Sequence, residues 1–129
     1  MIYLDTSALV KLILQETETP ALLDWLAENS QKPRVTSALS RVELMRAAAR
    51  DGRPETTERA RLLLAGIDQI AISEHLLDVA ESIGPPSLRS LDAIHLASAA
   101  EVPLTALVAY DQRLLYGAVS LGLPVSSPA

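Results

Sequence analysis

The sequence predicts an α/β domain with a central, mainly parallel sheet, and three observations support this fold class. Short apolar segments that favour strands alternate with longer segments of helical periodicity. The chain has 129 residues, of which 49% are hydrophobic, and this is ample for a core. No repeat, low-complexity tract or linker divides it. We therefore expect a single domain over residues 1–129, with helices covering both faces of the sheet.

The first part of the chain alternates between predicted strands and helices. Strands are expected at 2–4, 35–36 and 69–72, and helices at 7–15, from 19 onward, at 39–50 and at 55–65. Thr19 followed by Pro20 is typical of an N-cap and a first helical proline. The inward-facing residues are expected to be Leu22, Leu23 and Leu26 in one helix, and Val42, Met45 and Ala49 in the next.

The second part continues the same alternation. Helices are expected at 74–83, at 90–100 and from 111 to about 122, with an apolar strand at 105–110 and a last short strand at Val125. The sequence Gly84-Pro85-Pro86 ends one helix firmly, and Ser90 is expected to cap the next. Gly122 and Pro124 end the last helix.

Composition excludes several classes of function. The absence of cysteine removes disulfides, thiolate catalysis and cysteine-type zinc sites. A net charge of −5 and a single Trp with three Tyr and no Phe do not suit binding of nucleic acid by bulk charge or by base stacking. No apolar run is long enough to span a membrane, so we expect a cytoplasmic protein with no membrane contact.

Four acidic residues lie close to predicted helix beginnings: Asp5, Glu43, Asp92 and Asp111. Each one alone has an ordinary explanation, because acids are favoured near helix N-termini, and Ser40 with Glu43 fits a capping box. However, Asp5 and Asp111 follow strands, and the carboxyl ends of parallel strands share the edge where ligands bind. We therefore expect the four acids to converge at that edge.

Converging carboxylates need a neutralising partner. Two of them ~5 Å apart repel by roughly 3 kcal/mol at an effective dielectric constant of ~20. No Lys or Arg evidently joins the four acids, so a hard divalent cation, Mg²⁺ or Mn²⁺, is the expected occupant. The hydroxyls of Thr6 and Ser7 either orient Asp5 and the waters of the ion or cap the following helix. Such a site suits hydrolysis of a phosphodiester bond.

The two histidines are expected to be less central. His95 lies on the same predicted helix as Asp92, and we expect a packed, hydrogen-bonded core residue rather than a ligand at an all-oxygen site. His75 is expected at the surface. Seven of the eleven basic residues fall between positions 34 and 61, which indicates a solvated helical face or a local phosphate-binding strip.

Several motifs together resemble the PIN domain, and within that family the VapC-type toxins of bacterial toxin–antitoxin pairs. They are "IYLDTSALVKL", "SRVEL", "SLDAIHLASA" and the segment from "VAYDQRL" to "GLPVSSP", and they extend over nearly the whole chain. The resemblance implies a three-layer α/β/α fold and a Mg²⁺-dependent endoribonuclease. Asp5, Glu43, Asp92 and Asp111 match the four acids of the family, with Thr6 or Ser7 as the auxiliary hydroxyl.

The resemblance also implies partners: an RNA substrate, a homodimer, and a cognate VapB-like antitoxin whose tail blocks the acidic site. DNA would be met only indirectly, through the antitoxin. Asp5 and Asp92 are then the expected primary metal ligands, with Asp111 and Glu43 completing the site. Arg46 and Arg89, which are close in sequence to two of the acids, are candidates for contacts with RNA phosphates or are simply solvated.

Two other functions remain as alternatives. A non-catalytic PIN-like adaptor that binds RNA or protein is the main one, although the complete set of acids counts against it. The second is a phosphotransfer domain with Asp5 as nucleophile. Its motif needs a second aspartate two residues later, where this sequence has Ser7.

Overall fold

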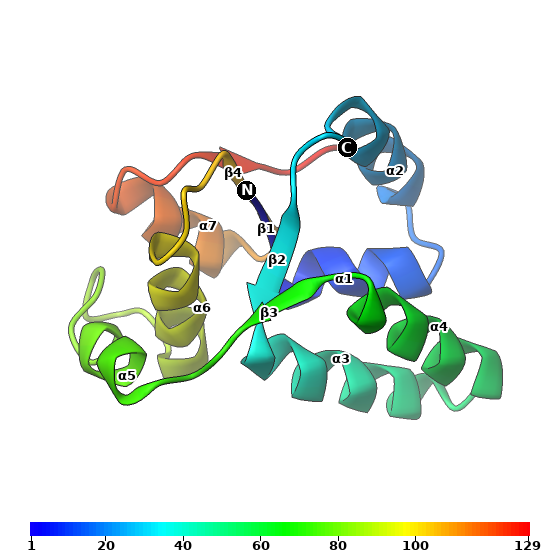
Figure 1. The fold of residues 1–129 in the computed structure, drawn as a ribbon, viewed down its shortest axis with the longest axis horizontal. Coiled ribbons are helices and arrows are strands. Elements are labelled where there is room, and N and C mark those ends of the chain that lie inside the picture. The colour runs from blue at the N-terminus through cyan, green and yellow to red at the C-terminus, as the bar shows by residue number, and fades with distance from the viewer.

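The computed structural model describes residues 1–129 and contains a sheet of five strands, all parallel, in the order β3-β2-β1-β4-β5. The strands are β1 (Ile2–Leu4), β2 (Arg34–Ser37), β3 (Asp68–Ile70), β4 (Ala106–Val108) and β5 (Val125–Ser126). Seven helices connect and flank them (Figure 1): α1 (Thr6–Ile13), α2 (Thr19–Glu28), α3 (Ala38–Asp51), α4 (Pro54–Ala65), α5 (Glu74–Ala80), α6 (Ser90–Ala100) and α7 (Gln112–Ser120). The predicted α/β class and three-layer α/β/α arrangement are confirmed.

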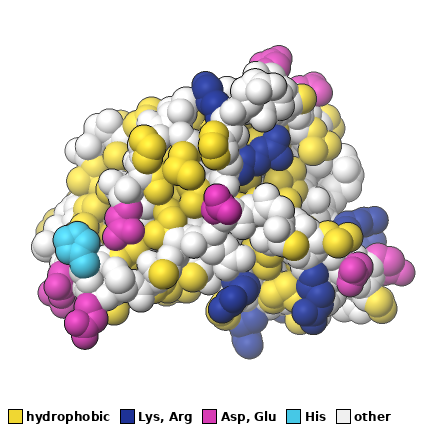
Figure 2. Space-filling model, in the orientation of Figure 1, with side chains coloured by type: hydrophobic (Ala, Val, Ile, Leu, Met, Phe, Trp, Pro, Cys, Tyr) yellow, Lys and Arg dark blue, Asp and Glu magenta, His cyan; other side chains and the backbone are white.

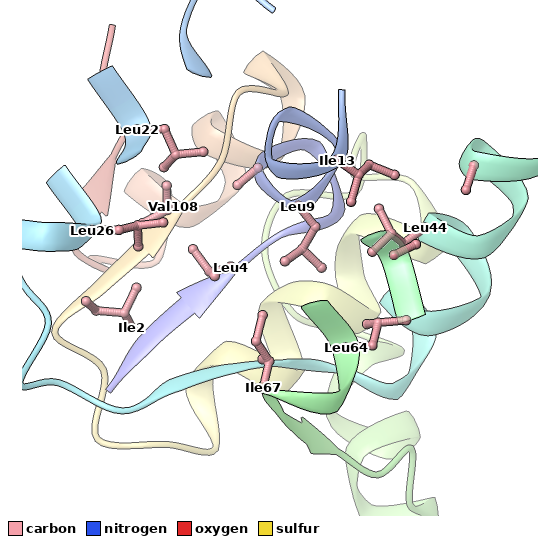
Figure 3. Packing of buried hydrophobic residues seen from close by; sticks show 13 residues of the cluster. Ile2, Leu4, Leu9, Ile13, Leu22, Leu26, Leu44, Leu64, Ile67 and Val108 are labelled. Carbon is pink, nitrogen blue, oxygen red and sulfur yellow. The ribbon is translucent and has the colours of Figure 1, made fainter. Parts of the chain in front are cut away.

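The two faces of the central strand β1 look into two separate cores. Ile2 and Leu4 belong to a cluster of 13 buried residues under α1 to α4, which Figure 3 shows from close by. Tyr3 points the opposite way, into a second cluster of eight buried residues under α6 and α7. This follows from the alternation of side chains along a strand. β1 is thus covered on both faces, as the apolar run at the N-terminus predicts.

The parallel arrangement puts the carboxyl ends of the strands at one edge. Tyr3 pairs in register with Val35 of β2 and with Leu107 of β4, so these three strands end side by side. Figure 1 shows α1 and α3 starting next to each other where β1 and β2 end. None of the helices is long and apolar enough to pass through a lipid bilayer.

Three predicted helix caps are wrong. Glu18, not Thr19, is the N-cap of α2, and the Thr19 hydroxyl instead donates to the Lys11 carbonyl at 2.8 Å. Ser90 is the first residue of α6, and Arg89 before it is the N-cap without a side-chain bond. In both cases the helix begins at the residue that was predicted to cap it, one position earlier than expected. Packing of the helix outweighs the ~1 kcal/mol that a side-chain cap contributes.

The capping box at Ser40 and Glu43 is also absent. β2 passes directly into α3, so Ser37 is the N-cap and its hydroxyl oxygen accepts from the Leu39 amide at 3.1 Å. Ser40 lies within the first turn and is fully buried, and Glu43 lies in the second turn. The helix dipole therefore does not account for Glu43, which strengthens the case for another role.

Two predicted inward faces need correction. Leu23 of α2 is 52% exposed and Val42 of α3 is 53% exposed. Ala49 is exposed as well, and the buried stripe of α3 runs through Ser40, Leu44 and Ala48 instead. Because this buried stripe begins with a serine, the pattern of hydrophobic residues alone does not identify it. Smaller differences are that α5 ends at Ala80, not Ile83, and β3 spans Asp68–Ile70, not 69–72.

Candidate active site

Asp5 is fixed at the point where β1 ends. It is only 5% exposed and is the N-cap of α1. Its Oδ2 accepts hydrogen bonds from the Ser7 amide at 3.1 Å and from the Ser7 hydroxyl at 2.7 Å. That hydroxyl oxygen in turn accepts from the Tyr110 amide at 2.9 Å. Ser7 therefore orients Asp5, as one of its two predicted roles required, but it does not cap the helix, because the N-cap of α1 is Asp5.

Glu43 reaches the same place from the second turn of α3. Its Oε1 accepts from the Thr6 hydroxyl at 2.7 Å and lies 2.7 Å from Nε2 of His95. Partial burial by itself would raise the pKa of the Glu43 carboxyl, but the hydrogen bonds from His95 and Thr6 outweigh it and lower the pKa. The Glu43 carboxylate is thus held in its ionised form by two neighbours.

His95 is the residue whose place in the site the sequence did not reveal. It is 3% exposed, as expected for a packed core histidine. Its Nδ1 lies 2.7 Å from the Tyr3 hydroxyl, and its Nε2 also lies 3.5 Å from Oδ1 of Asp5. Burial opposes a charge on the ring, but the bond to Glu43 and the charges of Asp5, Glu43 and Asp92 raise the pKa of His95. Its spacing of three residues from Asp92 on one helix is the signal that indicates this position.

Asp92 and Asp111 occupy the more open side of the site. Asp92 lies in the first turn of α6, and its pKa is raised, first by partial burial and then by the charges of Asp111 and Asp5. No hydrogen bond to the Asp92 carboxylate counteracts this rise in its pKa. Asp111 is exposed and lies at the beginning of the last helix, as predicted, where it is the N-cap of α7, with Oδ1 accepting from the amides of Arg113 at 2.9 Å and Leu114 at 3.1 Å.

All four predicted acids therefore act on one another, directly or through a shared neighbour. The electrostatic influence of Asp5 and Asp111 reaches Asp92, and Asp5 and Glu43 share the Nε2 of His95. The expectation that no Lys or Arg joins the four acids needs correction, because Arg113 partly offsets the charge around Asp92. In addition, His95 contacts Asp5 and Glu43.

The two predicted arginines lie at the surface beside the acids. Arg46 follows Glu43 by three residues on α3, and Arg89 is the N-cap of α6. Both are exposed, and neither takes part in a salt bridge. Figure 2 shows further Lys and Arg side chains gathered where α3 and α4 lie. His75, as expected, is exposed at the start of α5.

No group of three or more His, Asp or Glu side chains is arranged to hold a metal ion by itself. A closed protein cage is therefore excluded, and any cation bound here would have to keep much of its water shell. The acids nevertheless offer only oxygen ligands, and the pKa of Asp92 is raised, first by partial burial and then by the charges of Asp111 and Asp5, which His95 and Arg113 offset only in part. Mg²⁺ binds in this way, through few carboxylates and several waters. Asp5, Asp92, Asp111 and Glu43 are the residues that would hold it.

Comparison with known proteins identifies the family of the chain. The PIN domain model matches residues 2–118. Ribonuclease VapC47 of Mycobacterium tuberculosis is 53% identical over 132 residues, a match that covers 99% of this chain and 97% of that protein. The chain therefore belongs to the PIN domain family, and within it to the VapC group.

Solved structures show the same fold at low sequence identity. The crystal structure of VapC20 of M. tuberculosis, a toxin that cleaves the sarcin–ricin loop, gives a TM-score of 0.75 at 19% identity, covering 99% of this chain and 100% of that one. A toxin–antitoxin complex from Klebsiella pneumoniae gives 0.72 at 22% identity, covering 100% and 98%. Both likenesses establish the fold over the whole chain.

Proposed function

We propose that this protein is the toxin of a toxin–antitoxin pair, an endoribonuclease that hydrolyses RNA phosphodiester bonds with the help of Mg²⁺. The observation that carries the proposal is the gathering of the acids: Asp5 and Glu43 both lie at Nε2 of His95, and the pKa of Asp92 is raised, first by partial burial and then by the charges of Asp111 and Asp5. Such a cluster of oxygen donors attracts a divalent ion and, through it, a phosphate. The high identity to a ribonuclease of the VapC group supports RNA as the substrate.

The bound ion would supply an activated water and stabilise the charge that develops on the phosphate oxygens. The chain itself supplies the geometry. Asp5, anchored through one oxygen by Ser7, and Asp92, which has no such anchor, are the proposed primary ligands. Asp111 and Glu43 complete the donor set and orient water. Thr6 contributes by holding Oε1 of Glu43.

Arg46 and Arg89 are proposed to contact RNA phosphates on either side of the acids. Both are exposed and free of acidic partners, so their charge is available to a polyanion. The net charge of −5 then sets no obstacle, because the ion and these local arginines, rather than the whole protein, attract the substrate.

The proposed partners are a second copy of the chain and a VapB-like antitoxin, with DNA reached only through the antitoxin. The likeness to a toxin–antitoxin complex supports the antitoxin. Co-expression with the product of a small neighbouring gene should give a complex without ribonuclease activity. Light scattering on the toxin alone tests the dimer.

The decisive experiment is inducible expression followed by sequencing of the new 5′ ends of cellular RNA. We expect discrete cleavage sites with the wild type, loss of these sites with Asp92→Asn, and no loss with Asp24→Asn, an exposed acid of α2. Purified protein should cleave RNA with Mg²⁺ or Mn²⁺ and stop when EDTA is added. Tight binding without any cleavage, with either ion supplied, would favour the non-catalytic adaptor instead.

A further inference from the structure

A line of buried polar groups connects the core under α6 to the acidic site. It begins at Tyr3 of β1, which is fully buried, and passes through His95 of α6 to Glu43 of α3. The two rings meet edge to face, with centroids 6.1 Å apart and planes at 80°. Three elements that are distant in sequence thus contribute one side chain each, and the middle one is a histidine.

The hydrogen-bond pattern allows only one arrangement of the neutral imidazole ring. Asp5 and Glu43 carboxylates only accept hydrogen bonds, so Nε2, which faces both, carries the hydrogen. Nδ1 is then bare and accepts from the Tyr3 hydroxyl at 2.7 Å. The Tyr3 hydroxyl therefore reinforces the tautomer that the two carboxylates impose, and in this tautomer Nε2 has no lone pair for a metal ion.

We propose that Tyr3 and His95 are positioning residues, which hold Glu43 in the orientation that its role at the acidic site requires. The role of Glu43 at the site is part of the proposed function, so this inference rests on that proposal. The hydrogen bonds themselves do not depend on it. His95 and Thr6 both bind Oε1 of Glu43, and no protein group binds Oε2. One oxygen is anchored while the other is left for water or an ion.

This anchoring matters because a glutamate side chain is long and rotates freely. Glu43 extends from the second turn of α3 and is 28% exposed, so the helix alone does not fix its carboxylate. Asp5, in contrast, is short and already fixed by Ser7. His95 should therefore act mainly through Glu43, and groups of this kind commonly contribute about 10–100-fold to activity or metal affinity.

A double-mutant cycle tests this coupling. His95→Leu should lower kcat about 10–100-fold with little change in KM for RNA, and His95→Gln, which keeps an N–H donor, should recover part of the loss. In a Glu43→Ala background, His95→Leu should have no further effect. If the two losses multiply instead, His95 does not act through Glu43 and the proposal is wrong. His75→Gln, at an exposed histidine, is the matched control.

Two measurements remain informative if the protein cleaves no RNA. The ¹⁵N spectrum of the histidine ring should show the hydrogen on Nε2 in the wild type and a changed tautomer balance in Tyr3→Phe, but not in the control Tyr116→Phe. The affinity for Mn²⁺, followed by electron paramagnetic resonance, should fall about 10-fold in His95→Leu. An unchanged tautomer in Tyr3→Phe together with unchanged Mn²⁺ affinity in a folded His95→Leu variant would overturn the proposal.

Discussion

The acidic site has two halves that are built in opposite ways. Asp5 and Glu43 are held by hydrogen bonds from Ser7, Thr6 and His95, and the pKa of Glu43 is lowered. Asp92 has no such donor, and its pKa is raised by burial and by Asp111 and Asp5. The first pair of acids is organised by hydrogen bonds within the chain, whereas Asp92 carries a charge that His95 and Arg113 offset only in part.

If the site binds an ion, as proposed, this difference lets one chain combine stability with affinity for that ion. If every carboxylate were fully compensated by protein donors, an ion would gain little by binding. If none were, the mutual repulsion would weaken the fold at the edge of the sheet. The anchored half limits this strain, and the uncompensated half provides the attraction.

The largest expected effect is on catalysis, and it should be the same for both halves. Asp5→Asn and Asp92→Asn should each reduce RNA cleavage by more than about 100-fold, since direct ligands matter more than outer groups, which contribute about 10–100-fold. Single-turnover assays on a labelled RNA measure this. Substantial activity in either variant would mean that the corresponding half is structural only.

The second-largest expected effect is the change in stability when Mg²⁺ is added, and it should depend on Asp92. At about 100 times its dissociation constant, Mg²⁺ should raise the free energy of unfolding by about 2.7 kcal/mol, because it binds only the folded state. EDTA should reverse the gain, and Asp92→Asn should abolish most of it. Thermal unfolding at several Mg²⁺ concentrations provides the measurement, and a Tm that does not respond in the wild type contradicts the metal site.

A smaller effect should distinguish the anchored half in the absence of metal. Asp5→Ala removes the N-cap of α1 and should lower the free energy of unfolding by about 1 kcal/mol. Asp5→Asn keeps an oxygen that can accept from the Ser7 amide and should be nearly neutral. Urea denaturation in EDTA compares the two. Equal losses would show that charge, not capping, is what Asp5 contributes to stability.

The smallest effect has the opposite sign. Asp92→Asn should stabilise the metal-free protein by a few tenths of a kcal/mol, a modest value because Asp92 is only partly buried and solvent screens its charge. Since its folded pKa is raised, ionised Asp92 disfavours the folded state. The stability of the wild type relative to the variant should therefore fall as pH rises from the ordinary aspartate pKa through the raised one, and then level off. A constant difference across this range would argue against repulsion at Asp92.

The sequence was sufficient for the features that depend on local pattern. Alternating apolar segments predicted the parallel sheet, and the rule that ligands lie beyond the carboxyl ends of strands brought Asp5 and Asp111 to one edge. Asp111 was also correctly placed at the beginning of the last helix, of which it is the N-cap. These features follow from the periodicity of hydrophobic residues along the chain and from the chemistry of single residues.

Features that depend on which element packs where were not predictable in this way. The buried side of α3 contains Ser40, whose hydroxyl accepts from Thr36 at 2.7 Å, so a hydrophobic pattern alone points to the wrong face. Likewise, nothing in "SLDAIHLASA" shows that His95 meets Tyr3 and Glu43. In the sequence, His95 is separated from Tyr3 by 92 positions and from Glu43 by 52. Long-range hydrogen bonds of this kind exist only after the core has formed.

The position of β1 in the middle of the sheet has a consequence for synthesis of the chain on the ribosome. β1 is made first, but it pairs with β2 at residues 34–35 and with β4 at residues 106–108. Asp92 and Asp111 also come late, so a nascent chain that carries Asp5 and Glu43 has only half of the acidic site. The complete set of acids therefore exists only after residue 111 has been synthesised, so the early part of the nascent chain cannot form the site before the later part joins it.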